Sequence, residues 1–564
     1  MRTRLPIQCI RASFLPVSRV IPVYQQFHPM STSTRPELFS YTSGRFLYDE
    51  TARLRERYIE FDPDTLLREI EKHIGLSHGQ AKRLTKFAEG GFNRVFLITM
   101  EDGSEAIVKT PYSIAGPKHY ATASEAATLH YLHSQGISVP KVYGYSSSKS
   151  NPVGIEYIIM EKAPGVSLAT MWRSMSKKQR HTLASSFVEV EKQFFDLPFG
   201  SLGSLYFKKD VPTELQAGLY DRDTRTDDLS EIFCIGPTAD YMFWHGERAN
   251  FDLDRGPCEE GIDWARRLGK PVELYFLHNG VFPGIKYPET YIDLLDKYLA
   301  LAPYLLPKDP KNPFNQPTLR HPDLNPNNIF ISPETGTISC IIDWQHSKIE
   351  PRLLAAGYPR AFENPDPEQS LELKEPALPA HYETMPVEEK DAADELYRRR
   401  LLFYYYRIFI GHLNKAHLAC LRDPILFPRQ HLVDRAGRQW NGNTMTLKGA
   451  LLRIIEYWPY LADTAGVSCP VQFPETEVDG FHEQEQLWFS LNKVVDHWRD
   501  QVGGVNEDGW ISNETYEDSM RKIAELKASL IAEAEGDKED IYLLEKGWLF
   551  RDREANPSPD SIKS

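Results

Sequence analysis

The sequence predicts an α+β protein with two lobes, a small antiparallel sheet followed by a larger helical lobe. Two short apolar runs, 95–100 and 105–109, flank the Asp102-Gly103 pair, and this combination is typical of a β-hairpin. A further apolar run ends just before residues 163–165, where Ala-Pro-Gly interrupts any regular element. The chain beyond this break is mostly helical in pattern, so we expect the boundary between the two lobes near residue 164.

The other elements follow from apolar periodicity and from the positions of breakers. We expect helices over 66–74, 122–133, 397–421 and 443–462, a strand over 155–160, a strand-loop-strand unit over 318–345, and an acidic, proline-rich surface loop over 364–396. We expect a leader over 1–36 and a helical extension over 37–80 before the two lobes. The small lobe should cover 81–163, and the helical lobe should cover 164–465 with an insertion at about 207–290. A second helical extension with a polar tail is expected over 466–564.

Composition and charge narrow the class of protein. With 564 residues, 41% of them hydrophobic and 12% aromatic, the chain can bury a large core and is not of the disordered type. The formal net charge of −14 argues against a nucleic-acid binder, which needs a basic surface. The six cysteines lack C-x-x-C spacing, so we expect no disulfide framework or zinc site. No apolar stretch reaches the roughly 18 residues of a membrane-spanning helix, so no membrane insertion is expected.

The first 36 residues differ in composition from the rest of the chain. They contain five arginines and no acidic residue, and the first acidic residue of the chain is Glu37. An arginine-rich segment without acids resembles a mitochondrial transit peptide, so we expect the mature protein in the mitochondrial matrix. A disordered N-terminus without a targeting role is the alternative, because prolines at positions 6, 16 and 22 interrupt any long amphipathic helix.

The strongest functional pattern is His-Pro-Asp-Leu-Asn-Pro-Asn-Asn at 321–328, which is followed by an apolar strand that ends at Asp343. Phosphoryl transfer needs a carboxylate that orients the attacking hydroxyl group and accepts its proton, and it needs hard oxygen ligands for Mg²⁺. Asp323 suits the first task. Asn328 and Asp343 suit the second, because a strand-turn-strand between them would return Asp343 to the loop. An Asn- and Pro-rich turn with incidental acids is the alternative.

A second group of candidate residues lies around the predicted hairpin. Gly90 and Gly91 would let the backbone approach phosphate oxygens closely, although a plain turn is the alternative. Lys109 ends the returning strand, where a lysine needs a charged partner unless it is a solvated edge residue. Glu125, in the following helix, is the partner that we expect. Alternatively, Glu125 closes a capping box with Thr122 at the start of that helix.

The order of these motifs resembles that of the aminoglycoside phosphotransferase family, whose fold is similar to that of protein kinases. The H-x-D-x4-N pattern at 321–328 and the Ile-Asp-Trp sequence at 342–344 resemble the small-molecule branch of this fold. The resemblance covers about 81–350 and implies a bilobal protein-kinase-like fold that binds ATP and Mg²⁺. A fungal mitochondrial group within this fold is also similar, through the residues after Gly90 and the insert around 243–257.

The resemblance also implies a role for each candidate residue. The implied roles are catalysis for Asp323 and His321, contact with the nucleotide for Gly90, Gly91 and Asn93, contact with the ATP phosphates for Lys109 braced by Glu125, backbone recognition of adenine at Glu161 and Ala163, and Mg²⁺ binding for Asn328 and Asp343.

We therefore expect transfer of a phosphoryl group from ATP, with Mg²⁺, to the hydroxyl group of a small molecule. The sequence identifies neither this acceptor nor a protein partner. A catalytically silent kinase-fold protein, which binds nucleotide or acts as a scaffold in mitochondrial maintenance, is the alternative. A protein kinase is a weaker third possibility, because Asp343 is followed by Trp344 and Gln345 instead of Phe-Gly.

Overall fold

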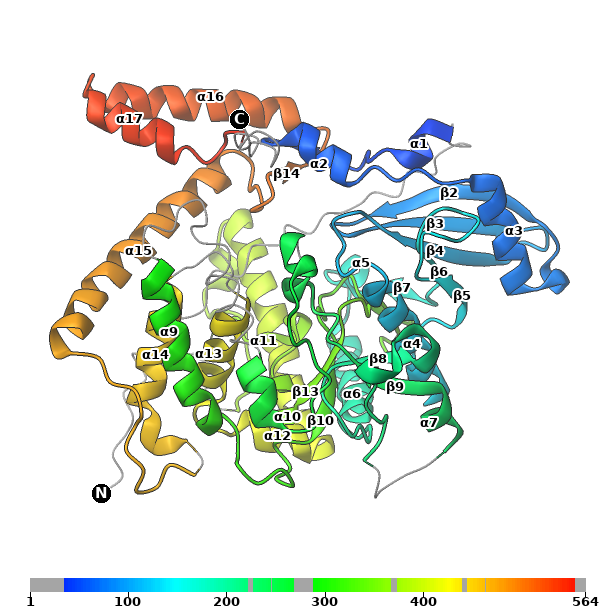
Figure 1. The fold of residues 1–564 in the computed structure, drawn as a ribbon. Coiled ribbons are helices and arrows are strands. Elements are labelled where there is room, and N and C mark those ends of the chain that lie inside the picture. Colours follow the sequence, from blue (N-terminus) through cyan, green and yellow to red (C-terminus); the bar gives the residue numbers. More distant parts are fainter. Residues whose placement is uncertain are drawn as a thin grey trace, which may run out of the picture. The chain divides into compact units, whose positions relative to one another are not determined.

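A five-stranded antiparallel sheet forms the small lobe (Figure 1). The computed structural model describes residues 35–221, 227–244, 246–267, 288–366, 373–438, 444–461 and 463–552. The strands lie in the order β2-β3-β4-β6-β5, with bounds β2 (Ala81–Glu89), β3 (Asn93–Met100), β4 (Glu105–Pro111), β5 (Val142–Ser146) and β6 (Tyr157–Glu161). The predicted hairpin is confirmed, since the Met100 amide donates to the Ser104 carbonyl at 2.9 Å across a turn in which Gly103 has φ +85°.

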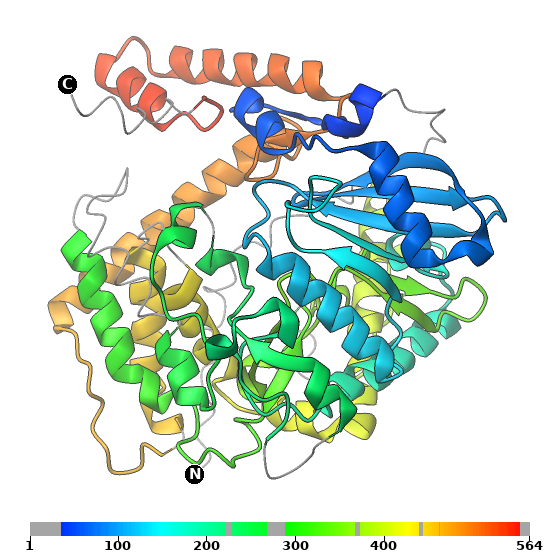
Figure 2. The ribbon, with the colours of Figure 1, turned by 45° about the vertical axis from the view of Figure 1, so that its right-hand side comes forward.

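Two helices cover this sheet. The first, α3 (Pro63–Ile74), begins at the capping residue Asp62 and packs on the edge strand β5 (Figure 2). The second, α4 (Tyr120–Ser134), packs on β5 and β6 and has almost no exposed face, which is why its Ala-rich sequence shows no amphipathic pattern. It begins two residues before the expected start, and this shift moves Glu125 out of the position that a capping box with Thr122 requires.

The contacts along the chain divide it into two compact units. The larger unit comprises Phe61–Leu84 and Val95–Phe481, and the smaller comprises Met1–Glu60, Thr85–Arg94 and His482–Ser564. Residues 37–60 and 482–552 of the two predicted extensions therefore belong to one unit, together with the turn between β2 and β3, whereas 61–80 and 466–481 belong to the larger unit. Among the described residues, no helix combines the length and apolar character needed to cross a membrane. The expected leader lies outside the described residues as far as position 34.

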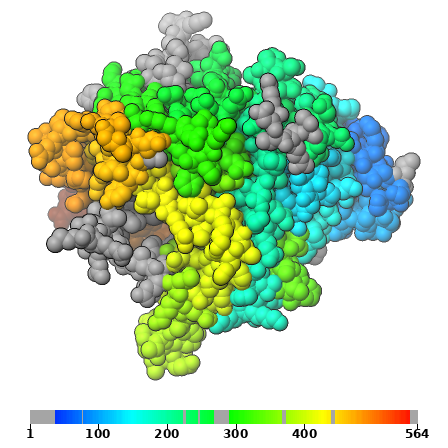
Figure 3. All heavy atoms as spheres, turned by 90° about the horizontal axis from the view of Figure 1, so that it is seen from below, coloured from blue at the N-terminus to red at the C-terminus, as the bar shows by residue number. Residues whose placement is uncertain are grey.

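The rest of the larger unit is mainly helical, as predicted. Its helices are α5 (Leu168–Met171), α6 (Lys177–Phe195), α7 (Asp228–Ile232), α9 (Pro288–Leu301), α10 (Arg352–Ala355), α11 (Val387–Leu413), α12 (Lys415–Leu421), α13 (Leu426–Arg438) and α14 (Thr444–Glu456), and α15 (Glu475–Gln501) begins in it. An apolar core lies between α9, α13 and α14 and includes Tyr298, Leu432 and Leu451. On the surface, the green atoms around residue 300 adjoin the yellow atoms of the later helices (Figure 3).

One expected loop is partly wrong. The acidic, proline-rich segment 364–396 was expected to be a surface loop throughout, but α11 begins at Val387 and includes its last ten residues. Glu388 and Glu389 occupy the first turn of α11, where carboxylates favour a helix through its dipole. The acidic composition that indicated a loop is thus partly the signature of a helix N-terminus. Part of this segment and much of the expected insertion at 207–290 lie outside the described residues.

Short strands in the larger unit frame the loop at 321–328. Strand β10 (Pro317–Arg320) pairs with β13 (Lys348–Pro351), while β11 (Ile329–Ile331) lies between β12 (Ile338–Ile341) and β7 (Val166–Ser167). A separate pair is formed by β8 (Ser204–Phe207) and β9 (Phe233–Gly236). The loop thus begins after a strand of a two-stranded sheet and ends at the central strand of a three-stranded sheet, so that both of its ends are fixed by strand pairing.

The smaller unit joins both ends of the chain through one strand pair. Strands β1 (Arg45–Phe46) and β14 (Trp510–Ile511) are antiparallel neighbours. Around them lie α1 (Arg35–Phe39), α2 (Glu50–Glu56), most of α15, α16 (Tyr516–Glu533) and α17 (Lys538–Gly547). A small apolar core that includes Leu47, Val502, Ile523 and Trp548 holds these segments together.

Candidate active site

The loop at 321–328 is anchored by a buried histidine. The Nε2 atom of His321 lies 2.9 Å from the Ile342 carbonyl oxygen, and the Asp323 amide donates to Nδ1 at 3.1 Å. These partners require the neutral ring with its proton on Nε2. Burial lowers the pKa of His321 to about 4, which keeps the ring neutral near pH 7. Both ring nitrogens are therefore occupied in holding the loop against the end of β12.

Asp323 is the carboxylate that this anchoring positions. Its side chain is 41% exposed, so a substrate can reach it. The side-chain amide of Asn325 donates to Oδ2 of Asp323 at 2.7 Å, and Nη1 of Arg360 lies 3.4 Å from Oδ1. Arg360 was not found from the sequence, because no spacing or motif connects it with the loop. It is brought there by the hydrogen bond from the Ala361 amide to the Leu324 carbonyl, at 3.1 Å.

The structure brings Asn328 and Asp343 to the same place. Ile329 pairs with Ile341 across β11 and β12, and the Ile342 amide donates to the Asn328 carbonyl at 3.0 Å. Asn328 is thus opposite Ile342, one residue before Asp343. Its side-chain amide nitrogen donates to the Asp323 carbonyl at 2.9 Å. Within the described part of the chain, the side-chain carbonyl oxygen of Asn328 accepts no hydrogen bond, which leaves it available as a ligand.

Lys109 links these residues to the sheet. Its Nζ atom lies 2.7 and 2.8 Å from the two carboxylate oxygens of Glu125 and 2.6 Å from Oδ1 of Asp343. The ion pair expected with Glu125 is therefore present, and Lys109 is not a solvated edge residue. Thr122, the residue of the alternative capping box, donates its hydroxyl to Glu156 at 2.7 Å. Lys109 is thus held by α4 on one side and by the turn after β12 on the other.

Opposing effects set the protonation states of this triad. Burial disfavours the ammonium form of Lys109, but the Asp343 and Glu125 carboxylates outweigh it and raise its pKa. Burial raises the pKa of Glu125, against the attraction of Lys109 and a hydrogen bond from the Trp344 amide. Asp343 is only partly removed from water, which would raise its pKa, yet Lys109 holds this pKa below its ordinary value. One ammonium between two carboxylates leaves a formal charge of −1 at neutral pH, since +1 − 2 = −1.

The backbone at Asp343 is in an uncommon conformation. Its φ is +66°, in the left-handed region that few residues other than glycine adopt, and such residues gather at functional sites. The turn directs the carboxylate to Lys109, while the side chain remains 45% exposed. The next residue, Trp344, is fully buried, and its ring lies edge-on to the ring of His321 with centroids 4.6 Å apart. The buried indole thus fixes the residue on one side of Asp343.

Strand β6 ends at the positions expected to meet adenine. Glu161 pairs with Ala106 of β4, and its amide donates to the Lys141 carbonyl at 2.8 Å. Ala163 lies beyond the strand, and in the described part of the chain its backbone groups make no hydrogen bond. A free backbone donor and acceptor at this point suit recognition of a flat heterocycle, whereas the amide of Glu161 is already used.

Gly90, Gly91 and Asn93 belong to the smaller unit and are described within it. The Gly90 amide donates to the Asn93 carbonyl at 2.8 Å, which closes the turn between β2 and β3. A methyl group added to Gly91 would have no neighbour within 4 Å, and one added to Gly90 would meet only the Asn93 carbonyl, at 3.7 Å. The turn is therefore open around its glycines. The residues that flank it, Glu89 and Arg94, have a role that the sequence did not indicate.

The oxygen atoms of Asp343 and Asn328 are of the kind that suits Mg²⁺, Ca²⁺ and Mn²⁺. Within the described ranges, no group of three or more His, Cys, Asp or Glu side chains could hold a metal ion. Mg²⁺ instead keeps several waters and is bound through one or two carboxylates together with phosphate oxygens. The exposed Asp343 carboxylate and the unused Asn328 carbonyl oxygen meet this smaller requirement.

The chain is similar to several known proteins. The model of the phosphotransferase enzyme family matches residues 83–238. Proteins of two Aspergillus fumigatus strains, each named Subtelomeric hrmA-associated cluster protein, are 31% identical over 518 residues, which cover 84% of this chain and 98% of theirs. Altered inheritance of mitochondria protein 9 of Eremothecium gossypii is 25% identical over 73% of this chain and 74% of its own. A thermostable mutant of aminoglycoside phosphotransferase APH(4)-Ia, solved as a ternary complex with ADP and hygromycin B, is 12% identical in sequence to this chain. The two structures match with a TM-score of 0.33 over 70% of this chain and 98% of that one.

The buried position of His321 predicts a dependence of stability on pH. Its pKa falls from 6.5 to about 4 on folding, so the unfolded chain binds more protons between these values and stability falls as the pH falls through this window. We expect His321→Gln to have a lower free energy of unfolding than wild type near pH 7. This difference should shrink by about 2 kcal/mol near pH 5, because only the wild type loses stability as the pH falls. Urea unfolding of both proteins at both pH values measures this difference.

His412→Gln is the matched control, because His412 is exposed at the end of α11. This variant should follow the wild type at both pH values. A gap between His321→Gln and wild type that stays constant from about pH 7 to about pH 5 would contradict a neutral, buried His321.

Proposed function

Because this chain belongs to the phosphotransferase enzyme family, we propose that it transfers a phosphoryl group from ATP to the hydroxyl group of a small molecule. The observation that carries this proposal is the ion triad of Lys109 with Glu125 and Asp343, together with the hydrogen bonds that attach Asp343 to the loop of Asp323. These contacts unite a cation for phosphates, a ligand for a divalent metal and an exposed carboxylate, which are the parts that phosphoryl transfer requires.

Asp323 is the proposed catalytic carboxylate. It is exposed enough to contact an acceptor hydroxyl group, and it would orient that hydroxyl and take its proton as the O–P bond forms. The side-chain amide of Asn325 donates to Oδ2 of Asp323 at 2.7 Å, so the orientation of the carboxylate is fixed before substrate arrives. Arg360, beside Oδ1, adds a positive charge where the transferring group would lie. His321 acts as a positioning residue, because both of its nitrogens are used within the protein.

The residues that would hold the cofactors lie around Lys109. Lys109, braced by Glu125, would bind phosphate oxygens of ATP, and Asp343 and Asn328 would bind Mg²⁺. When bound, ATP supplies the phosphoryl group and Mg²⁺ neutralises charge on it. The free backbone groups of Ala163 would recognise adenine. Gly90, Gly91 and Asn93 would cover the phosphates, in keeping with the open turn between β2 and β3.

We propose a mitochondrial location for the mature protein, in the matrix. Two observations support it: the arginine-rich leader over 1–36, and relatives in several yeasts whose names describe them as mitochondrial.

The proposed chemistry predicts different defects for two aspartates. Asp323→Asn removes the proton acceptor but no phosphate or metal contact, so turnover should fall by about 10²- to 10⁴-fold while ATP with Mg²⁺ still raises the melting temperature. Asp343→Asn should abolish both turnover and the Mg²⁺-dependent part of the stabilisation. The measurements are phosphate transfer from labelled ATP in a metabolite library and thermal unfolding with and without Mg²⁺ and ATP.

Asp293→Asn is the control, since this residue is exposed on α9 within the same unit. It should leave both measurements unchanged. ATP-induced stabilisation of the wild type without any turnover would favour the catalytically silent alternative. No stabilisation by ATP at all would exclude nucleotide binding and leave a scaffold role.

The leader predicts the result of an import experiment. Deletion of residues 1–36 should abolish import into isolated mitochondria, because it removes all five arginines that precede the first acidic residue. Fusion of 1–36 to a fluorescent protein should direct that protein to the matrix. Replacing the arginines of the fused segment with glutamines provides the control and should prevent import. Unchanged import of the shortened chain would contradict a targeting role.

A further inference from the structure

The turn between β2 and β3 is flanked by a buried ion pair. Glu89 is the last residue of β2, and Arg94 is the second residue of β3. The Arg94 side chain is fully buried, and its Nε atom donates to Oε1 of Glu89 at 2.9 Å. The pair spans the glycine turn, where a methyl group added to Gly91 would meet nothing within 4 Å. Contacts that hold Glu89 and Arg94 therefore help to set the conformation of this open turn.

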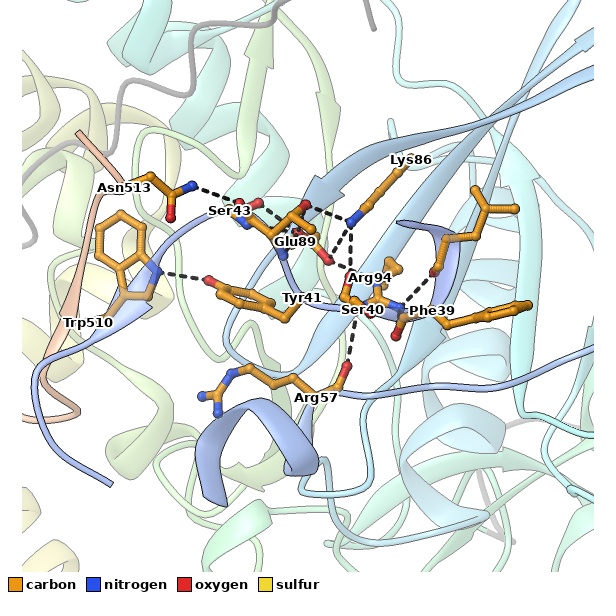
Figure 4. A network of polar contacts seen from close by, with 12 residues as sticks. Phe39, Ser40, Tyr41, Ser43, Arg57, Lys86, Glu89, Arg94, Trp510 and Asn513 are labelled. Atoms are coloured by element: carbon orange, nitrogen blue, oxygen red, sulfur yellow. Dashed lines mark hydrogen bonds and ion pairs between the residues drawn. The ribbon is translucent and has the colours of Figure 1, made fainter. Parts of the chain in front are cut away.

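The Glu89 carboxylate is held by the segment before β1. Oε2 accepts from the amides of Thr42 and Ser43 at 2.8 and 3.0 Å, and from their hydroxyl groups at 3.2 and 3.0 Å. Oε1 also accepts from Nζ of Lys86 at 3.3 Å, beside its bond from Arg94. Figure 4 shows Glu89 between Ser43 and Lys86. These charge-assisted hydrogen bonds fix the Glu89 carboxylate in place, because a buried carboxylate without donors would be highly unfavourable.

Arg94 is held by the same N-terminal segment. Its Nη1 atom donates to the carbonyl oxygens of Leu38 and Phe39, each at 2.8 Å, and Nη2 donates to the Arg57 carbonyl at 3.1 Å. Lys86 adds a bond to the Ser40 carbonyl at 2.9 Å (Figure 4). Both sides of the glycine turn are therefore attached to residues about fifty positions earlier in the chain.

The C-terminal extension in turn holds this N-terminal segment. The Trp510 indole donates to the Tyr41 hydroxyl at 2.8 Å, and the side-chain amide of Asn513 donates to the Thr42 carbonyl at 2.9 Å (Figure 4). The Leu47 amide donates to the Gly509 carbonyl at 2.9 Å, next to the pairing of β1 with β14. Gly44 fits this contact so closely that an added methyl group would lie 2.4 Å from the Trp510 ring nitrogen.

We propose that residues 38–57 and 506–513 form a clamp that sets the conformation of the glycine turn and, through it, the affinity for ATP. The proposal rests on the proposed function, because it assigns the turn to nucleotide binding. Thr42, Ser43, Glu89 and Arg94 are then positioning residues, which act on ATP through the backbone of Gly90 and Gly91. Contact between the two ends of the chain thereby controls the nucleotide site, and a factor that separates them would weaken ATP binding.

The test weakens the clamp without changing the turn. In the full chain, the double variant Thr42→Val and Ser43→Ala removes two hydroxyl donors to Glu89, and with the Thr42 hydroxyl an acceptor for Nζ of Lys86 at 2.7 Å, but it leaves both amides in place. We expect about tenfold faster hydrogen exchange in the peptide over 88–95 without nucleotide, and about tenfold weaker ATP binding in the presence of Mg²⁺. KM for ATP should rise with little change in kcat, because no catalytic or metal-binding side chain is altered.

Two further variants separate positioning from general loss of structure. The exchange of hydroxyl residues Thr42→Ser with Ser43→Thr keeps both donors and should behave as wild type. Trp510→Phe removes the indole donor to Tyr41 together with the ring atoms that lie against Gly44, and it should speed hydrogen exchange over 88–95 by loosening the N-terminal segment. Glu89→Gln is less informative alone, since it leaves Arg94 buried beside a neutral group and can prevent folding.

Each outcome decides a different claim. If wild type and the hydroxyl-exchange variant bind ATP and the Thr42→Val, Ser43→Ala variant binds it equally well, the clamp proposal is wrong and the proposed function stands. Faster exchange over 88–95 with unchanged ATP affinity also overturns it, since the turn would then not govern the nucleotide. If none of the proteins binds ATP, the proposed function itself fails.

Discussion

The ammonium group of Lys109 between two carboxylates is the interaction on which the site depends. Glu125 comes from α4, Lys109 from β4, and Asp343 from the turn after β12, 234 residues further along the chain. A buried ammonium is tolerated only with such partners, and removing one partner from a buried pair destabilises proteins by about 3 to 5 kcal/mol. The correct docking of the sheet against the helical part of the larger unit is thus enforced by the same atoms that would bind phosphates and metal.

The charge of the triad explains why no cluster of acids is needed there. Glu125 neutralises Lys109 within the protein, so the charge of Asp343 remains in excess and its side chain remains accessible. A cation that retains waters and shares phosphate oxygens needs only that carboxylate and a neutral oxygen such as that of Asn328. Lys109 holds the pKa of Asp343 below its ordinary value, which favours the ionised form of the carboxylate that we propose as a metal ligand.

The parts of the site that the sequence predicted are those built by local structure. Asp323, Asn328 and Asp343 lie within one strand-turn-strand, so their spacing and the apolar runs between them place them together. Lys109 and Glu125 required one further assumption, that a strand lysine seeks a partner in the next helix, and the earlier start of α4 excludes the capping alternative. Arg360 reaches Asp323 through a segment with no regular pattern. Its approach depends on tertiary packing, which short-range periodicity does not report.

The two loops of the proposed site are held in different ways, and this difference has a consequence for the chain as a whole. The loop of Asp323 is fixed by His321, by Asn325 and by the strands on either side, and its Pro326 carbonyl also accepts from the Ser167 hydroxyl and the Ala169 amide at 3.1 and 3.0 Å. The glycine turn is fixed by Glu89 and Arg94, whose partners belong to the N-terminal segment, and that segment is fixed by residues near 510. A chain without its C-terminal extension would keep the candidate residues of the larger unit and the donors from Thr42 and Ser43, but it would lose the contacts from Trp510 and Asn513 to the N-terminal segment. Under the clamp proposal, the extension contributes to ATP affinity through the glycine turn. The motif at 321–328 can be recognised in a short stretch of sequence, whereas the contacts that hold the glycine turn join residues near 40, 90 and 510.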